Sequence, residues 1–197
     1  MQKRQFLGAS LAGTGVFIAF ASSAQHAPKT SQGPTLLTVS GLIGHGNRGP
    51  LDPALDQMMG KQKVAFSKAQ VFDFAALAAM PAVSITPTLE YDSQAHKLKG
   101  PLLADVMKAC GVKPNDKTAY FLRAVDGYVA NITAAEASRR RFILATHLDG
   151  RPMALGGLGP LWAVYDADRF ADIAAKPLSE RFAACPWATY HIEVKEG

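Results

Sequence analysis

Residues 151–166, RPMALGGLGPLWAVYD, contain the glycines that could bring a backbone close to the phosphate of a cofactor. A Walker loop needs a lysine and a hydroxyl residue that open a helix, and a dinucleotide loop needs a strand, G-x-G-x-x-G and then a helix. Here Gly156, Gly157 and Gly159 are followed by Pro160 and an apolar run with β character. The local residues therefore favour a tight turn before a strand.

Two Asp-Gly pairs, at 126–127 and 149–150, predict hairpin turns with polar side chains beside them. Asp126 could accept a hydrogen bond from a ligand that Tyr128 covers. Alternatively, Asp126 caps its own turn and Tyr128 lies half-buried on a sheet. An arginine flanks each turn and could bind an anion or stand in solvent: Arg123 and Arg151.

The spacing of the histidines does not indicate a metal site. None of the five histidines belongs to an H-x-x-x-H or H-E pattern, so we predict neither a zinc nor an iron site. A serine triad would need a nucleophile elbow, and the chain has none. Histidines in predicted strands, such as His147 and His191, are expected to be hydrogen-bonded scaffolding.

The first residues have the pattern of an export signal. Lys3 and Arg4 precede an apolar stretch at 6–21 and a small-residue exit, which predicts cleavage after Ala24 and a periplasmic protein. Without cleavage the segment would be an anchor, although it is short and rich in glycine for a membrane span. The order Lys-Arg-Gln-Phe-Leu resembles a twin-arginine signal with lysine in place of the first arginine, so the export route stays open. We expect no stable membrane span after cleavage.

Charge argues against nucleic acid as a partner. The formal net charge of the whole chain is +5, and removal of Lys3 and Arg4 leaves +3. The densest basic cluster, Arg139-Arg140-Arg141, has no aromatic residues interleaved with it, so we expect a solvated turn before a strand.

The two cysteines, Cys110 and Cys185, could pair in an oxidising compartment. Cys110 falls on the apolar face of a predicted helix, which is the ordinary place of a small buried residue. Sequence spacing does not bring the two within bridging distance, so their pairing stays open, as does the oligomeric state.

Many short strands with a few inserted helices predict an α+β fold, mixed and mostly antiparallel, in one domain over 35–197 after a flexible leader at 25–34. The predicted strands are 35–43, 82–91, 118–125, 128–132, 142–148, 161–165 and 188–194. The predicted helices are 67–80 with Ser67 as N-cap, 100–111 and 133–140.

Four segments in a fixed order carry a resemblance to a known family. They are LKGPLLADVMKACGV at 98–112, LRAVDGYVANI at 122–132, DGRPMALGGLGPLWAVYD at 149–166 and PWATYHIEV at 186–194. Together they resemble the molybdopterin-binding oxidoreductase domain, the sulfite-oxidase fold, from about Thr35 to Val194. The resemblance implies a mostly β domain and, in the full enzymes, molybdenum held on a pterin cofactor, with the glycine run as a loop that faces the cofactor.

The chain departs from that family where the chemistry is done. Catalytic members have a metal-ligating cysteine in the segment that corresponds to 83–100, VSITPTLEYDSQAHKLKG, and this segment contains none. A soft metal centre prefers a thiolate, which Thr86 and Thr88 cannot replace. The full enzymes also have an arginine where this chain has Trp162, so a cation that would face the cofactor's anionic groups is missing. They commonly have a second domain as well.

We therefore expect an oxidoreductase-like domain that acts by binding a small molecule or a periplasmic redox partner, with an unknown cofactor and molybdopterin disfavoured. The alternative is a periplasmic molybdopterin-dependent oxidoreductase with an atypical metal ligand. An accessory subunit that docks through 44–57 is a third possibility. In the binding hypothesis, Trp162 lines a pocket that has lost its original cofactor. The candidate pocket residues are Arg123, Asp126, Tyr128, Arg151, Gly157, Gly159 and Trp162.

Overall fold

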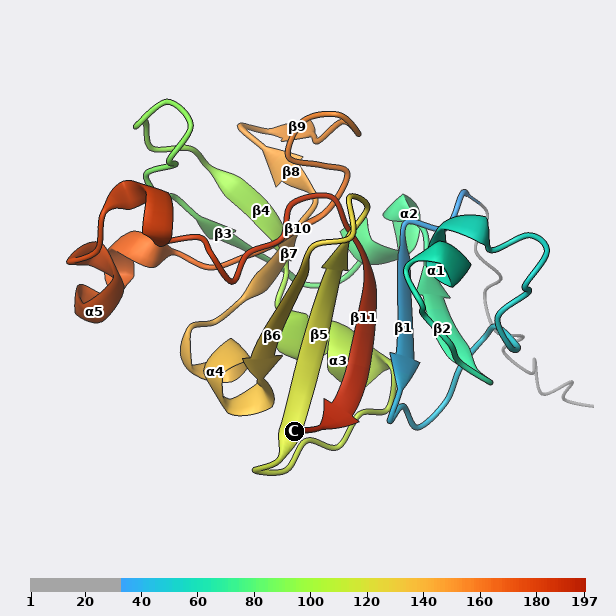
Figure 1. Cartoon of the computed structure of the whole chain (residues 1–197). Coiled ribbons are helices and arrows are strands. Elements are labelled where there is room, and N and C mark those ends of the chain that lie inside the picture. Colours follow the sequence, from blue (N-terminus) through green and yellow to red (C-terminus); the bar gives the residue numbers. More distant parts are fainter. Residues whose placement is uncertain (1–32) are drawn as a thin grey trace, which may run out of the picture.

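The computed structural model describes residues 33–197, which form three sheets with short helices around them (Figure 1). The predicted export signal at 1–24 and most of the predicted leader at 25–34 lie outside the described residues. The mixed sheets with mostly antiparallel pairing confirm the predicted α+β class.

The largest sheet has five strands in the order β2-β1-β11-β5-β6. Only β1 and β11 run parallel, and the other neighbours are antiparallel. The strands are β1 (Leu37–Gly41), β2 (Ala69–Phe72), β5 (Thr118–Ala124), β6 (Val129–Thr133) and β11 (Thr189–Glu196). The last strand of the chain thus lies in the middle of the sheet, between the first strand and the predicted hairpin.

Alternation along these strands separates an apolar face from a polar one. Val39 and Ile192 are register partners and both belong to the main hydrophobic core. On the other face, the Ser40 hydroxyl and Nε2 of His191 are 2.9 Å apart and fully buried. Phe66, from the segment before β2, stacks on the His191 ring at 6.4 Å. The breaker-rich excursion that precedes β2 therefore helps to cover the second face of the sheet.

Two smaller sheets complete the β structure. One has the order β3-β4-β8-β9 and the other pairs β10 with β7. Their bounds are β3 (Ala82–Ile85), β4 (Leu98–Pro101), β8 (His147–Leu148), β9 (Arg151–Pro152), β7 (Ile143–Ala145) and β10 (Trp162–Val164). The backbones of β4 and β7 approach so closely at Gly100 that a Cβ there would lie 2.0 Å from the Leu144 carbonyl oxygen.

The helices are short and cover the edges and one face of the sheets. Their bounds are α1 (Gln57–Lys61), α2 (Phe74–Ala78), α3 (Leu103–Ala109), α4 (Ala134–Arg139) and α5 (Ala171–Ala174), with 3-10 turns η1 (Ala167–Arg169) and η2 (Leu178–Glu180). Helix α3 buries Leu103, Val106 and Met107 and lies behind the five-stranded sheet in Figure 1. None of the helices within residues 33–197 combines the length and the hydropathy that a membrane span requires.

Most predicted elements are confirmed, including the helices at 100–111 and 133–140 and the terminal strand. The predicted helix over 67–80 is wrong, because Ala69–Phe72 pairs with β1 as a strand and the helix begins only after Asp73. The Asp73 side chain accepts a hydrogen bond from the Ala76 amide at 2.7 Å and acts as the N-cap that the prediction gave to Ser67. Strand pairing overrode a helical pattern that was periodic only over its second half.

Two further expectations need correction. The predicted strand at 82–91 ends at Ile85, just before Pro87. The turn at 139–141 is present, but Arg140 is only 7% exposed and is not a solvated side chain.

Candidate functional site

A cavity of about 280 Å³ lies where three distant segments meet. We call it the Tyr128 pocket. The segment after β3, the β5–β6 turn and the stretch before β11 supply its polar and aromatic wall: Glu90, Tyr91, Asp126, Tyr128, Phe182 and Trp187. Its size is near the low end of the roughly 300–1,000 Å³ typical of small-molecule sites.

The β5–β6 turn is fixed by hydrogen bonds. Asp126 Oδ1 accepts from the Tyr128 amide at 2.9 Å, and Gly127 between them has a φ of +94°, which favours glycine. The Tyr128 hydroxyl donates to the Ala183 carbonyl at 2.6 Å, so the turn is tied to the stretch before β11. Asp126 thus caps its own turn, as one of the two interpretations held, and both side chains also line the cavity, as the other required.

Trp162 does not line this pocket, but it contacts residues that do. The side chain is fully buried, and its indole Nε1 donates to the Cys185 carbonyl at 2.9 Å. Its ring also packs on Phe182, with ring centroids 5.8 Å apart. Because Phe182 and Cys185 both line the cavity, Trp162 positions the floor without reaching a ligand.

Both cysteines are free and buried. Burial raises the pKa of the Cys110 thiol to about 12, and it raises that of Cys185 further above the ordinary range. A backbone hydrogen bond from Tyr165 acts on the Cys185 thiol in the opposite direction but does not offset the burial. Neither sulfur is therefore a thiolate near neutral pH, although Cys185 lies at the pocket.

Two of the other predicted site residues line a different cavity. Arg151 and Gly157 belong to an open hollow of about 590 Å³ beside β8 and β9. Gly159 packs against Met153, where a Cβ would lie 2.4 Å from the Met153 Cβ. The glycine run is a turn between β9 and β10, as the local residues favour.

Arg123 lines neither of these two cavities. It is in β5 with His191 as its register partner, and its Nε is buried without a hydrogen-bond partner in the part of the chain that the structure describes. Of the seven candidates, the structure therefore brings only Asp126 and Tyr128 into one pocket and Arg151 and Gly157 into another.

Sequence reasoning missed Glu90, Tyr91 and the exposed side of Trp187. Trp187 is 38% exposed and lies in the segment before β11. Burial, and to a smaller degree the neighbouring Glu90 carboxylate, raises the pKa of Tyr91 to about 12. Glu90 and Tyr91 fall in the segment where the family resemblance places the metal-ligating cysteine, and Pro87, which ends the preceding strand, was the signal that they lie in a loop.

The chemistry of the Tyr128 pocket is aromatic and acidic. Four aromatic rings and two carboxyl groups line it, and no lysine or arginine does. Within residues 33–197, no group of three or more His, Cys, Asp or Glu side chains could hold a metal ion. Rings and carboxylates together suit a small organic cation, because the π face attracts positive charge and the carboxylates complement it.

Comparison with known proteins gives support at the level of the fold. No family model matches the chain, and no curated protein matches its sequence. A solved structure of the sulfane dehydrogenase SoxCD from Paracoccus pantotrophus aligns with 82% of this chain at a TM-score of 0.55 and 14% sequence identity. The chain spans 38% of the length of that protein. The similarity is one of fold, and it is distant.

Proposed function

We propose that this chain is an exported, periplasmic binding protein built on the sulfite-oxidase fold of molybdopterin-binding oxidoreductase domains, and that the Tyr128 pocket binds a small organic cation. The observation that carries the proposal is the pocket wall of aromatic rings and two carboxyl groups, Glu90 and Asp126, without a basic residue. The distant fold similarity to a dehydrogenase and the ordered motifs support the choice of fold. The basic-apolar-small pattern of 1–24 supports export.

The residues of the pocket do not fit a molybdenum-pterin cofactor. The metal would need a soft thiolate, and both thiols are buried with raised pKa values. The anionic groups of the cofactor would face Glu90 and Asp126 with no arginine or lysine beside them. Trp162, where the family has an arginine, is fully buried and offers only an indole N–H that is already bonded.

A first experiment identifies what the native protein carries. The protein is purified from its own host, denatured, and analysed by mass spectrometry for released small molecules and by elemental analysis for molybdenum. We expect an amine or quaternary ammonium compound and no molybdenum. Stoichiometric molybdenum would overturn the proposal in favour of the alternative, a molybdopterin-dependent oxidoreductase with an atypical metal ligand.

A second experiment tests the pocket with a matched pair of probes. Benzylammonium and neutral benzyl alcohol have nearly the same shape, so the difference in their affinities reports the contribution of charge. We expect benzylammonium to bind more tightly and Glu90→Gln to remove most of that difference, since a charge-assisted contact contributes roughly tenfold in affinity. Arg151→Gln, in the other cavity, is the control. Equal binding of both probes would contradict the proposed specificity.

A further inference from the structure

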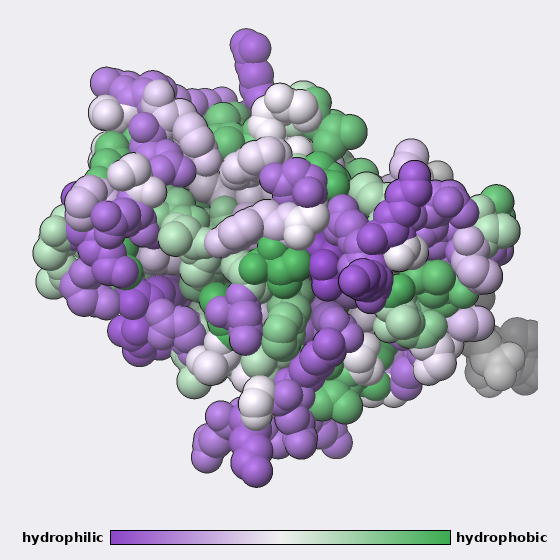
Figure 2. Space-filling view, in the orientation of Figure 1, coloured by the Kyte–Doolittle hydropathy of each residue, from purple (hydrophilic) through white to green (hydrophobic). Residues whose placement is uncertain are grey.

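A third cavity, of about 200 Å³, is lined by four arginines. We call it the arginine pocket. Arg139, Arg140 and Arg141 come from the end of α4 and the turn after it, and Arg169 comes from η1. The remaining wall contains Asp166 and the apolar side chains of Val83, Ile85 and Phe170. Hydrophilic residues gather on this side of the molecule, over α5 at the left of Figure 2.

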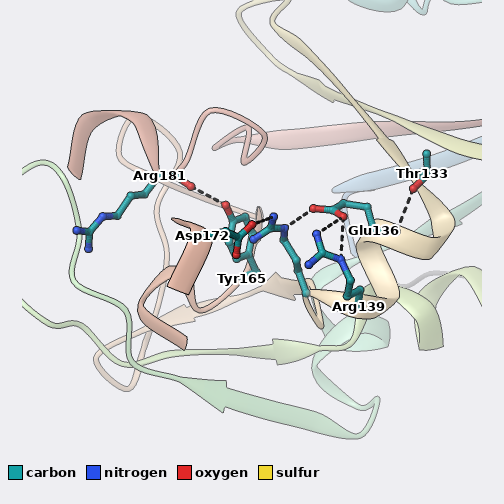
Figure 3. Close-up of polar contacts among 7 residues, drawn as sticks. Thr133, Glu136, Arg139, Tyr165, Asp172 and Arg181 are labelled. Carbon is teal, nitrogen blue, oxygen red and sulfur yellow. Dashed lines mark hydrogen bonds and ion pairs between the residues drawn. The ribbon is translucent and has the colours of Figure 1, made fainter. Parts of the chain in front are cut away.

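Arg140 is built into this pocket. Its Nε pairs with Glu136 and its Nη2 with Asp172 at 2.8 Å, two carboxylates that come from α4 and α5 and lie on opposite sides of the network (Figure 3). The guanidinium lies over the rings of Tyr165 and Phe170 at 5.4 and 5.3 Å. The side chain is 8% exposed. These contacts fix the guanidinium in one orientation before any ligand binds.

One nitrogen of this guanidinium makes no hydrogen bond within the described residues. Nη1 of Arg140 is buried and has no hydrogen-bond partner among residues 33–197. Buried donors are nearly always paired, because an unpaired one loses its hydration without compensation. An acceptor oxygen from a ligand in the pocket would satisfy it.

Two of the other three arginines, Arg141 and Arg169, contribute charge that the protein does not neutralise by ion pairing. The third, Arg139, is paired with Glu136 at 2.7 Å. Arg141 and Arg169 make no ion pair within the described part of the chain, and both are exposed. The left-handed backbone of Arg141, with a φ of +52°, belongs to the turn that leads into β7. Positive charge therefore converges on the cavity from α4 and from η1.

We propose that the arginine pocket binds a divalent tetrahedral oxyanion, phosphate or sulfate, either free or as a monoester whose apolar part lies against Val83, Ile85 and Phe170. Arginine forks match the geometry of such oxygens, and a pre-oriented guanidinium loses less entropy when it binds. The carboxylate of Asp166 opposes an anion in the same space. Its pKa is raised, chiefly by burial and to a smaller degree by the charge of Asp168. The site is independent of the Tyr128 pocket.

The test is calorimetric titration of the full chain with sodium sulfate, inorganic phosphate and phenyl phosphate at constant ionic strength. We expect saturable binding with a Kd of about 1 mM or below. Arg141→Gln combined with Arg169→Gln should weaken it by at least about tenfold without changing thermal stability, because both side chains are exposed and unpaired. The charge-matched control is Lys113→Gln with Lys117→Gln, which lie outside the pocket.

Asp166→Asn gives a change of the opposite sign. Removal of the carboxylate should tighten sulfate binding by about threefold or more, which a merely structural role would not produce. If phenyl phosphate binds more tightly than inorganic phosphate, the ligand is a monoester. If the two affinities are equal, the ligand is the free oxyanion. The proposal is overturned if none of the three probes gives saturable heat up to ~20 mM, or if the arginine double variant binds like the lysine control.

Discussion

Substitution of Trp162 by phenylalanine tests whether this residue supports the floor of the Tyr128 pocket. The indole Nε1–H that donates to the Cys185 carbonyl at 2.9 Å is lost, and a buried carbonyl without a partner costs about 1–3 kcal/mol. The smaller ring also leaves a void of roughly 40 Å³, which adds about 1 kcal/mol at about 24 cal/mol per Å³. Because Trp162 is fully buried, we expect a destabilisation of about 2–4 kcal/mol.

Urea denaturation with an unchanged m-value measures this difference. The matched control is Trp187→Phe, since the chain has two tryptophans and Trp187 is 38% exposed. It makes no side-chain hydrogen bond that the structure shows within the described residues, so its substitution should change the free energy of unfolding by no more than about 0.5 kcal/mol.

Equal destabilisation by the two substitutions, or an unchanged stability of Trp162→Phe, would contradict a supporting role for the indole N–H. Either result would mean that the indole N–H does not stabilise Cys185 in the folded protein. The floor of the pocket would then be held by the ring contact with Phe182 alone.

Three further outcomes follow from buried groups. Burial, with the positive charges of Arg123 and Lys195, lowers the pKa of His191 to about 4. The fold therefore holds this ring neutral, and roughly 2–3 kcal/mol of stability is lost as the pH falls from 6.5 towards 4. The free energy of unfolding measured in urea should then fall more between pH 7.5 and 4.5 for the wild type than for His191→Gln. Because both thiols are buried with raised pKa values, a thiol reagent at pH 8 should label Cys110 and Cys185 only in denaturant, and rapid labelling of the native protein would contradict the absence of a thiolate. Gly100→Ala should destabilise by about 2–3 kcal/mol in thermal unfolding, whereas Gly49→Ala, with nothing within 4 Å of its Cβ, should stay near the wild type.

The sequence predicted correctly the elements that are determined by contacts between residues close together in the chain. The Asp126-Gly127 turn follows from a left-handed glycine and a self-capping aspartate. Helix α3 follows from an apolar stripe that ends at a glycine. The error over 67–80 arose where a partner far along the chain decides the structure, since Ala69–Phe72 has the composition of either a helix or a strand until β1 pairs with it.

The pocket itself could not be derived from the sequence, because it depends on contacts between distant segments. Glu90, Asp126 and Trp187 line one cavity in a fold where β11, at the end of the chain, lies between β1 and β5. The hydrogen bond from Tyr128 to Ala183, 55 residues away, then closes the wall. The family resemblance indicated Asp126 and Tyr128, but the acidic character of the pocket came from a loop that had been read as a strand.

Tyr165 contacts one lining residue of each pocket, Arg140 and Cys185. Its ring lies under the Arg140 guanidinium, its backbone bonds the Cys185 thiol, and its hydroxyl donates to the Arg181 carbonyl at 2.7 Å. The ring of Tyr165 therefore helps to fix a cation at the arginine pocket, whereas burial, against this backbone hydrogen bond, keeps the Cys185 sulfur at the Tyr128 pocket uncharged. A basic triplet taken alone predicts a solvated turn. What makes Arg140 different from its neighbours is a carboxylate 32 residues away and the rings beneath it, and these belong to the fold.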